Sequence, residues 1–361
     1  MTAEVTMPAM RVGSHRIRVG RATILFALLS VGLVAAVIVA AGHGQLDIPA
    51  REVVGSVLHR LGLDIGPMPH APQGENTLWQ VRFPRVATAI VVGASLATAG
   101  ALMQGVFGNP LAEPAVVGVS SGAALAAAAV IVFDIGTFGA STTAAFAFAG
   151  GLITTLIVYL MSRDGGRTEV VTLVLTGIAV NAMASAGMAL MMFLGDTQAR
   201  EEIVFWTLGS LNGSRWPYVW VIAPLATVGI AGAVLMAGKL DLLALGDRAA
   251  RHVGVDVERL RLVAIVLVAV LTAAGVAFAG IIGFVGLVVP HLIRLAVGPG
   301  HRVLVPASAL GGALLLVVAD LGARTLVAYA DLPIGMLTAL VGGPFFFWLL
   351  RRARRTAGGW A

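Results

Sequence analysis

Long runs of apolar residues, separated by short polar segments, dominate the pattern of the chain. Most runs reach the roughly 20 residues that a helix needs to cross about 30 Å of hydrocarbon. They are continuously apolar and do not alternate with a period of two, so the pattern predicts membrane-spanning helices and not the strands of a β-barrel. The clear runs cover residues 22–41, 86–106, 115–133, 140–161, 170–193, 217–237, 262–281, 303–319 and 334–350.

A tenth candidate run, residues 284–297, is shorter and contains Pro290, His291 and Arg294. The distribution of positive charge decides whether it crosses, because cytoplasmic loops carry an excess of Lys and Arg. With the N-terminus inside and ten spans, 17 of the 24 Lys and Arg residues lie on the inner side, whereas nine spans give 12 against 12. The sequence therefore predicts ten transmembrane helices with both termini in the cytoplasm. The predicted parts are a basic arm at 1–21, a membrane domain at 22–350 and a basic tail at 351–361.

The overall composition agrees with a membrane protein, since 58% of the residues are apolar and 12% are charged. The first run is longer than the roughly 7–15 apolar residues of a signal peptide, so we expect it to remain as a helix. The absence of cysteine excludes disulfides and thiolate metal ligands. A pI near 10.8 is also typical of nucleic-acid-binding proteins, but the topology already explains the arginines, and no nucleic acid partner is expected.

Motifs for an energy source or for catalysis are missing from the sequence. The nearest approach to a phosphate-binding loop, at residues 232–240, has the wrong spacing and lacks the hydroxyl residue. The centres of the nine clear runs hold no acids or histidines, which ion-coupled carriers use at mid-membrane. Such a carrier stays open as an alternative, because backbone carbonyls at broken helices can coordinate sodium. We expect no cofactor and no metal in this chain, and no enzymatic activity.

Two polar segments beside the apolar runs need an explanation. GNPLAEP, residues 108–114, places two prolines, Asn109 and Glu113 between the second and third runs. The prolines end one helix and fix the entry to the next, so we expect Asn109 and Glu113 at the inner mouth of a passage. The alternative is that both side chains satisfy loop amides. The inner loop 238–261 exceeds an ordinary connection of about 4–6 residues, and it predicts one or two short helices that dock a cytoplasmic partner.

Six stretches follow one another from Arg82 almost to the C-terminus: RFPR (82–85), GASLATAGALMQGVFGNPLAEPAVVGVSSGAA (93–124), LLALGDRAARHVGV (242–255), AGIIGFVGLVVPHLIRLAVGPGHRVLVP (279–306), ADLGAR (319–324) and DLPIGMLTALVGGPFFFWLL (331–350). In this order they resemble the permease subunits of bacterial ATP-driven importers for iron siderophores, haem and cobalamin. The resemblance implies an all-α integral membrane fold, the type II ABC importer permease bundle, with ten helices per subunit in a homodimer. It also implies two cytoplasmic ATPase subunits, which bind the ATP, and a soluble or lipid-anchored substrate-binding protein. The expected location is the bacterial cytoplasmic (inner) membrane.

The resemblance also assigns roles to individual residues. In the cobalamin member of this family, the arginines of the RxPR and ADxxAR motifs face outward and meet glutamates of the binding protein. Carried over, these are Arg82, Arg85 and Arg324, which the predicted topology independently places outside; capping or lipid pairing is the alternative role. The stretch 242–255 matches the coupling helices, which lie in a groove of the ATPase. The implied coupling residues are Leu245, Gly246, Asp247, Arg248 and Ala249.

The cargo stays open among haem, ferric siderophores and cobalamin, with haem expected first. The fifth run, which borders the passage in this family, contains methionines, and a soft thioether suits a bulky, flat, apolar ligand such as haem. Gap filling in the core is the alternative. PLAEP, with Glu113 where aspartate is also found, resembles the haem branch, and Asp331 stands where the family usually has glutamate. The candidate pathway methionines are Met183, Met188, Met191 and Met192.

Overall fold

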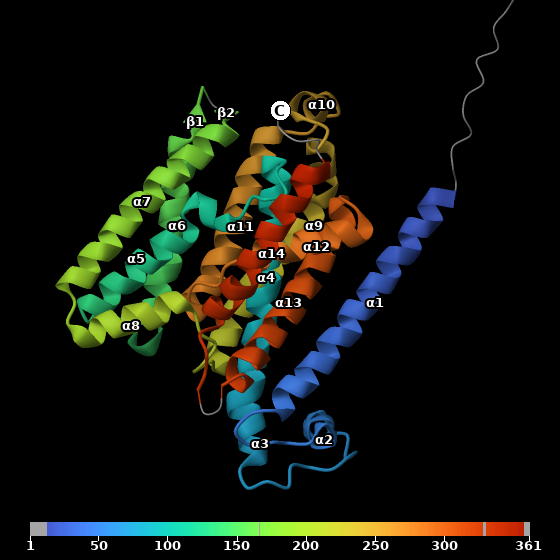
Figure 1. Ribbon diagram of the computed structural model, residues 1–361, viewed down its shortest axis with the longest axis vertical. Coiled ribbons are helices and arrows are strands. Elements are labelled where there is room, and N and C mark those ends of the chain that lie inside the picture. Colours follow the sequence, from blue (N-terminus) through green and yellow to red (C-terminus); the bar gives the residue numbers. More distant parts are fainter. Residues whose placement is uncertain (1–12, 166, 328–329, 357–361) are drawn as a thin grey trace, which may run out of the picture.

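The chain forms a bundle of helices that run roughly side by side along one long axis (Figure 1). The computed structural model describes residues 13–356 except 166 and 328–329. The predicted arm 1–21 and tail 351–361 therefore lie in part, at 1–12 and 357–361, outside the described residues.

The first half of the bundle contains one helix much longer than predicted. It runs from Gly74 to Phe107 through a short α-helical turn, a π-helical turn and α4, and Gly108 ends it in the left-handed conformation that favours glycine. The elements are α1 (Gly13–Gly42), α2 (Ala50–Arg60), α3 (Gly74–Asn76), η1 (Thr77–Arg82), α4 (Phe83–Phe107), η2 (Pro114–Val117), α5 (Val119–Val132), η3 (Gly139–Ser141), α6 (Thr142–Met161), β1 (Arg163–Asp164) and β2 (Arg167–Thr168).

In the second half, aspartates begin two of the helices. The Asp196 carboxylate accepts a hydrogen bond from the Ala199 amide at 2.7 Å, and Asp256 accepts one from the Arg259 amide at 3.0 Å. Such N-caps satisfy amides that the first turn leaves unpaired. The elements are α7 (Val170–Leu194), α8 (Thr197–Leu208), α9 (Trp216–Leu243), α10 (Asp247–His252), α11 (Val257–Ala279), α12 (Val285–Val297), α13 (His301–Thr325) and α14 (Ile334–Thr356).

The helices bear out the prediction of an all-helical membrane protein. Within the described residues, 7 helical segments are long and apolar enough to span a membrane. Three shorter apolar helices lie at Val119–Val132, Val285–Val297 and Ile334–Trp348. Together they follow the order of the ten predicted runs, and the doubtful run at 284–297 is a helix. The seven spanning segments are Gly20–Gly42, Gly74–Phe107, Thr142–Met161, Val170–Leu194, Trp216–Leu243, Val257–Ala279 and His301–Thr325.

Two helices extend into segments outside the apolar runs. Most of residues 194–216 is occupied by α8, because Asp196 supplies a cap that an apolar pattern does not register. The division between 350 and 351 falls inside α14, since arginine is a good helix former and continues the helix past the apolar run. The inner loop 238–261 contains one short helix, α10, as predicted.

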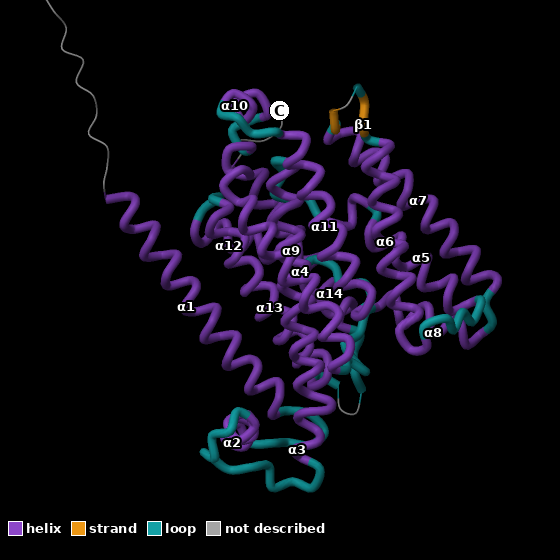
Figure 2. The backbone as a smooth tube through the Cα atoms, turned by 180° about the vertical axis from the view of Figure 1, so that it is seen from behind, coloured by secondary structure: helices purple, strands orange, loops and turns teal. Residues whose placement is uncertain are grey.

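The bundle has two ends formed by different elements, which we name the α10 end and the α2 end. The β1–β2 hairpin and α10 lie together at one end, and α2 and α3 lie at the other (Figures 1 and 2). The first described residues of α1 and the end of α14 both point toward the α10 end (Figure 1). Both views also show α5, α6, α7 and α8 on the side of the bundle opposite α1.

The core is built around α4, which packs against α13, α11, α9 and α12. Glycines permit these contacts. A Cβ atom on Gly93 or on Gly312 would overlap the carbonyl oxygen of the other residue, and one on Gly100 would overlap Gly286. Without a hydrophobic driving force between helices in lipid, such close backbone approach is a main source of packing energy. The small residues therefore serve tight packing at these positions.

Replacing Gly312 by alanine should destabilise the bundle. The added methyl group meets the Gly93 carbonyl and the Ala97 side chain, so one helix must shift, at a cost of about 1–3 kcal/mol. Gly20→Ala is the control, because Gly20 is also helical and has nothing within 4 Å of a built Cβ. Thermal unfolding in detergent should show a lower Tm for Gly312→Ala and an unchanged or higher Tm for Gly20→Ala. Equal Tm values would contradict the packing described.

Candidate functional site

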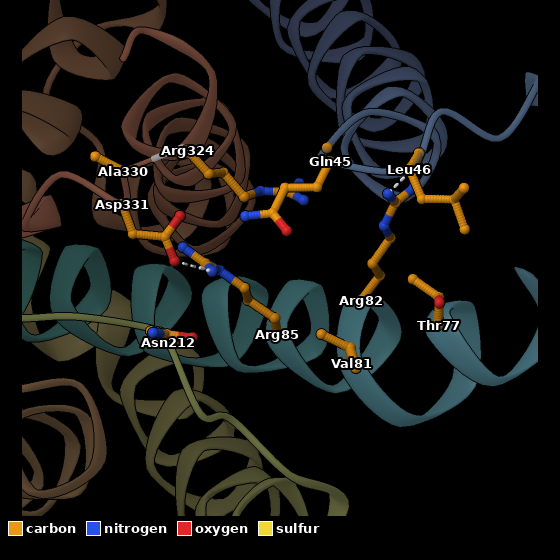
Figure 3. A pocket seen from close by; sticks show the side chains of 11 residues that line it. Gln45, Leu46, Thr77, Val81, Arg82, Arg85, Asn212, Arg324, Ala330 and Asp331 are labelled. Atoms are coloured by element: carbon orange, nitrogen blue, oxygen red, sulfur yellow. Dashed lines mark hydrogen bonds and ion pairs between the residues drawn. The ribbon is translucent and has the colours of Figure 1, made fainter. Parts of the chain in front are cut away.

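A cavity of about 550 Å³ at the α2 end brings together residues from distant parts of the chain (Figure 3). It contains all three arginines that the resemblance assigns to docking, Arg82, Arg85 and Arg324. The loop after α1, the start of α4, the loop before α9, the end of α13 and the segment before α14 all contribute. The lining residues are Gly44, Gln45, Leu46, Thr77, Val81, Arg82, Arg85, Asn212, Arg324, Ala330 and Asp331.

Arg85 lies at the centre of an ion-pair network in this cavity. Its Nε donates to Asp320 Oδ1 and its Nη1 donates to Asp331 Oδ2, each at 2.9 Å (Figure 3 shows the Asp331 pair). Arg324 approaches the other Asp320 oxygen, with Nε to Oδ2 at 3.3 Å. Asp320 is 1% exposed, so its charge is removed from water and depends on these two guanidinium groups. The network ties α4 to α13 and to the segment before α14.

Arg82 and Arg324 hold the end of α1. Arg82 Nη1 donates to the carbonyls of Ala41 at 2.6 Å and Gly42 at 2.8 Å, and Nη2 donates to Leu46. Arg324 Nη2 donates to the Ala40 carbonyl at 2.5 Å. The last carbonyls of a helix have no partner within it and carry partial negative charge, which cations stabilise. The capping role that the sequence left open is thus present in the structure.

These contacts distinguish Arg85 from the other two arginines. The hydrogen-bonding groups of Arg82 and Arg324 are directed at backbone carbonyls and at the buried Asp320. Arg85 instead donates one of its hydrogen bonds to Asp331, whose side chain is 36% exposed. Asp320 and Asp331 were not predicted as site residues. The spacing of Asp320 and Arg324, four residues apart on one helix, was the available signal for the buried pair.

The predicted coupling residues lie on the surface of the α10 end. Leu245 is 71% exposed, although leucine in a folded chain is usually covered, and Gly246 has a φ of +101° that favours glycine. Asp247 begins α10 and accepts a hydrogen bond at 2.9 Å from Nη2 of Arg261, a buried residue of α11. Arg248 and Ala249 are exposed. The segment is therefore an accessible turn fastened to the bundle through Asp247.

Asn109 and Glu113 both satisfy backbone amides. Asn109 Oδ1 accepts from the Leu111 amide at 2.9 Å. Glu113 Oε1 accepts from the Phe284 amide at 3.1 Å and so links the break between α4 and α5 to the break before α12. Phe284 has a φ of +66°, which is rare for a bulky residue. The contacts of both residues are those of the amide-satisfying alternative.

The four candidate methionines of α7 do not share one environment. Met191 is buried against Ala128 and Ile203, and Met188 and Met192 pack against the same cluster. Met183, in contrast, is 73% exposed. Gap filling therefore accounts for three of the four, and Met183 alone presents its thioether on the surface.

Two histidines of the region between α1 and α4 have partners nearby in the chain. His70 contacts Glu52 through its amide and through Nδ1, at 3.2 and 3.0 Å, and His59 Nδ1 lies 2.9 Å from the Gly55 carbonyl oxygen. Burial raises the pKa of the Glu52 carboxyl, but the hydrogen bonds and charge of His70 outweigh burial and hold this pKa below its ordinary value. These histidines stabilise the α2 region.

Comparison with known proteins identifies relatives of the whole bundle. The FecCD transport family matches residues 32–352. The hemin transport system permease protein HmuU of Yersinia pestis is 43% identical over 286 residues, covering 78% of this chain and 85% of that protein. The cobalamin import system permease protein BtuC of Halobacterium salinarum is 43% identical over 272 residues, covering 75% and 72%. A solved inward-facing structure of a metal-chelate type ABC transporter matches with a TM-score of 0.80 and 32% identity, covering 91% of this chain and 99% of that one.

Neutralising Asp320 should destabilise the protein far more than neutralising Asp331. Asp320→Asn leaves two largely buried guanidinium groups without their shared counter-ion, for which we expect a loss of about 3–5 kcal/mol. Asp331→Asn removes an exposed partner, with an expected loss of about 0.2–1 kcal/mol. The two Tm values in detergent measure the difference. A Tm for Asp320→Asn as high as that for Asp331→Asn would refute the central place of Asp320.

Proposed function

The chain belongs to the FecCD transport family as the permease subunit of an ABC importer for iron chelates, haem or cobalamin, and we propose that its cargo is haem. As a permease it is not itself catalytic, and ATP is bound by a partner. This family membership excludes the ion-coupled carrier that the sequence left open. The proposal also includes a homodimer with ten crossing helices per subunit, two ATPase subunits, and a binding protein that delivers the cargo.

The observation that supports an importer driven by a partner ATPase is the position of two different surfaces at opposite ends of one bundle. The exposed segment 245–249 lies at the α10 end, and the arginine cavity lies at the α2 end (Figures 1 and 3). An importer needs a motor contact on one side of the membrane and a delivery contact on the other. We therefore assign the α10 end, with both termini, to the cytoplasm and the α2 end to the outer side.

On the outer side, docking proceeds by exchange of a carboxylate at Arg85. Asp331 occupies one nitrogen of this guanidinium and is exposed enough to move aside, whereas Asp320 stays in place because it is buried. A glutamate or aspartate of the binding protein then takes the position of Asp331. Arg82 and Arg324 contribute positive charge that guides the approach, while their hydrogen bonds hold α1.

On the cytoplasmic side, segment 245–249 transmits the closure of the ATPase subunits. Leu245 supplies an apolar anchor for a groove on the partner, and Arg248 orients the contact. Asp247 passes the displacement to α11 through Arg261. Because Arg261 is buried, movement of α10 is coupled to the bundle and is not absorbed by a loose loop.

The second copy covers apolar faces that one copy leaves open. On α7, Met183 and Phe193 are largely exposed, and on α14 Leu340 and Phe347 are exposed as well. Two such faces across a central axis enclose a passage, with Asn109 and Glu113 near its inner mouth. Met183 then faces the cargo, while Met188, Met191 and Met192 shape the wall from behind. The exposed thioether, the HmuU relative and the PLAEP motif together support haem over the other chelates.

Haem should stimulate ATP hydrolysis by the complex of this chain with its ATPase and binding protein in liposomes. Ferric siderophore and cobalamin serve as matched cargoes and should leave the basal rate unchanged, because each would be a poor fit to a binding protein for haem. Stimulation by a siderophore or cobalamin alone would refute haem and retain the importer. Uptake by this chain alone, without ATP, would refute the importer mechanism itself.

Asp331→Asn should strengthen the binding protein's affinity by up to about fivefold, or ~1 kcal/mol, because it frees Arg85 from an exposed competitor. Arg85→Gln should weaken it by at least about tenfold. Asp64→Asn is the control, since Asp64 is an exposed acid at the same end that does not line the cavity. Surface plasmon resonance on nanodisc-embedded complex measures all three. Unchanged affinity in both Asp331→Asn and Arg85→Gln would remove Arg85 from the docking contact.

A further inference from the structure

A second cavity, of about 600 Å³, lies where α9 and α11 meet at the α10 end. Its floor is apolar: Met236 and Leu242 come from α9, and Leu260 and Val263 come from α11. The turn at residues 253–256, which joins α10 to α11, closes one side. None of these residues belongs to segment 245–249 or to the arginine cavity, although Leu242 and the turn at 253–255 lie in the wider stretch 242–255 that resembles the coupling helices.

Two cations line the groove without an ion-pair partner in the described part of the chain. Lys239 on α9 and Arg259 on α11 are both exposed. The nearby Arg251 and Arg261, in contrast, pair with Asp247 and Glu258. The one acid in the lining, Asp256, uses Oδ1 to accept the Arg259 amide as the N-cap of α11. The groove thus presents a net positive charge above an apolar floor.

The apolar floor continues along the outside of the bundle. From the groove toward mid-bundle, Leu235 of α9 is 83% exposed, and Leu262 and Val266 of α11 are also exposed. Both helices are long and apolar enough to span a membrane, so we expect these side chains to face hydrocarbon. The groove therefore lies where a spanning apolar surface ends in cationic side chains, at the depth of lipid headgroups.

We propose that this groove binds an anionic phospholipid of the leaflet on the α10 side. Lys239 and Arg259 contact the phosphate, and one acyl chain lies over Leu260 and Val263 and then along the exposed strip. A free phosphate ion would leave the apolar floor in water, and a zwitterionic lipid would bring a cationic group toward two cations. An anionic headgroup with its chains complements both parts of the groove. Bound there, the lipid joins α9 to α11 next to α10.

The test measures lipid retained by the full-length chain after purification in detergent and exchange into nanodiscs. Phosphatidylglycerol and phosphatidylcholine are offered in equal amounts, and native mass spectrometry counts the lipid that remains bound. Wild type should retain phosphatidylglycerol preferentially. The double variant Lys239→Gln/Arg259→Gln should lose this preference, by on the order of thirtyfold in affinity, since each cation near a headgroup contributes about fivefold. Its Tm identifies any variant that fails to fold.

The control variant, Arg302→Gln/Arg351→Gln, removes two exposed charges from the same end of the bundle and none from the groove. It should retain the lipid preference. Equal loss in both variants would show a general effect of surface charge and would overturn the site, as would full retention in the groove variant. Because the chain has no cysteine, Val253→Cys can report occupancy by its labelling rate. Protection by the ATPase subunits, with no protection by phosphatidylglycerol, would assign the groove to the ATPase and refute the proposal.

Discussion

The structure depends on one constraint: inside a membrane, a polar backbone group released by a helix break must find its partner within the protein. Two helix breaks are joined here by a hydrogen bond. Glu113, in the break between α4 and α5, accepts the amide of Phe284 in the break before α12. Asn181 of α7 donates to the Ala115 carbonyl at 3.2 Å and accepts from Ser121 at 2.6 Å. Each break is therefore held by hydrogen bonds from a residue of another segment.

Buried charge follows the same rule at the α2 end. Arg82 and Arg324 have their donors directed at the carbonyls that end α1, and Asp320 is enclosed by Arg85 and Arg324. A group whose hydrogen bonds are all made inside the protein cannot bind a partner without loss. Arg85 is the exception, because its second carboxylate, Asp331, is exposed to solvent. On the docking proposed above, structural and recognition roles therefore coexist in one cluster, and Arg85 alone has a counter-ion, Asp331, that is exposed enough to leave.

The features that depend on residues close together in the chain were predicted well from the sequence. Apolar run length predicted the spanning helices, and the run at 284–297, which the excess of inner arginine predicts to cross the membrane, forms a helix of 13 residues. Contacts over long sequence separations could not be predicted, because no local pattern records that Arg85 and Asp320, or Glu113 and Phe284, lie together. The methionines illustrate the same limit. Their spacing along α7 indicated one set, but the packing of α5 and α8 divides them, burying Met191 and leaving Met183 open.

Contacts through α11 link segment 245–249 to the segment before α14. At the α10 end, Arg261 of α11 binds Asp247 within the exposed segment 245–249. At the other end of this helix, 18 residues after Arg261 and so about 27 Å away at about 1.5 Å per residue, the Ala279 carbonyl accepts the Ser210 amide at 2.8 Å. The neighbouring Gly209 carbonyl accepts the Ile334 amide at 3.0 Å, three residues after Asp331.

This chain of contacts explains how a permease without its own energy source can be moved. A helix transmits axial displacement because its backbone hydrogen bonds lie along its axis, whereas loops of the same length would absorb it. Movement of α11 must therefore either carry the segment that contains Asp331 or break the bonds at Ala279 and Gly209. In the first case, force applied beside Asp247 reaches the carboxylate that occupies Arg85. The proposed motor contact and the proposed delivery contact are then physically joined, and neither requires a charged group at mid-membrane.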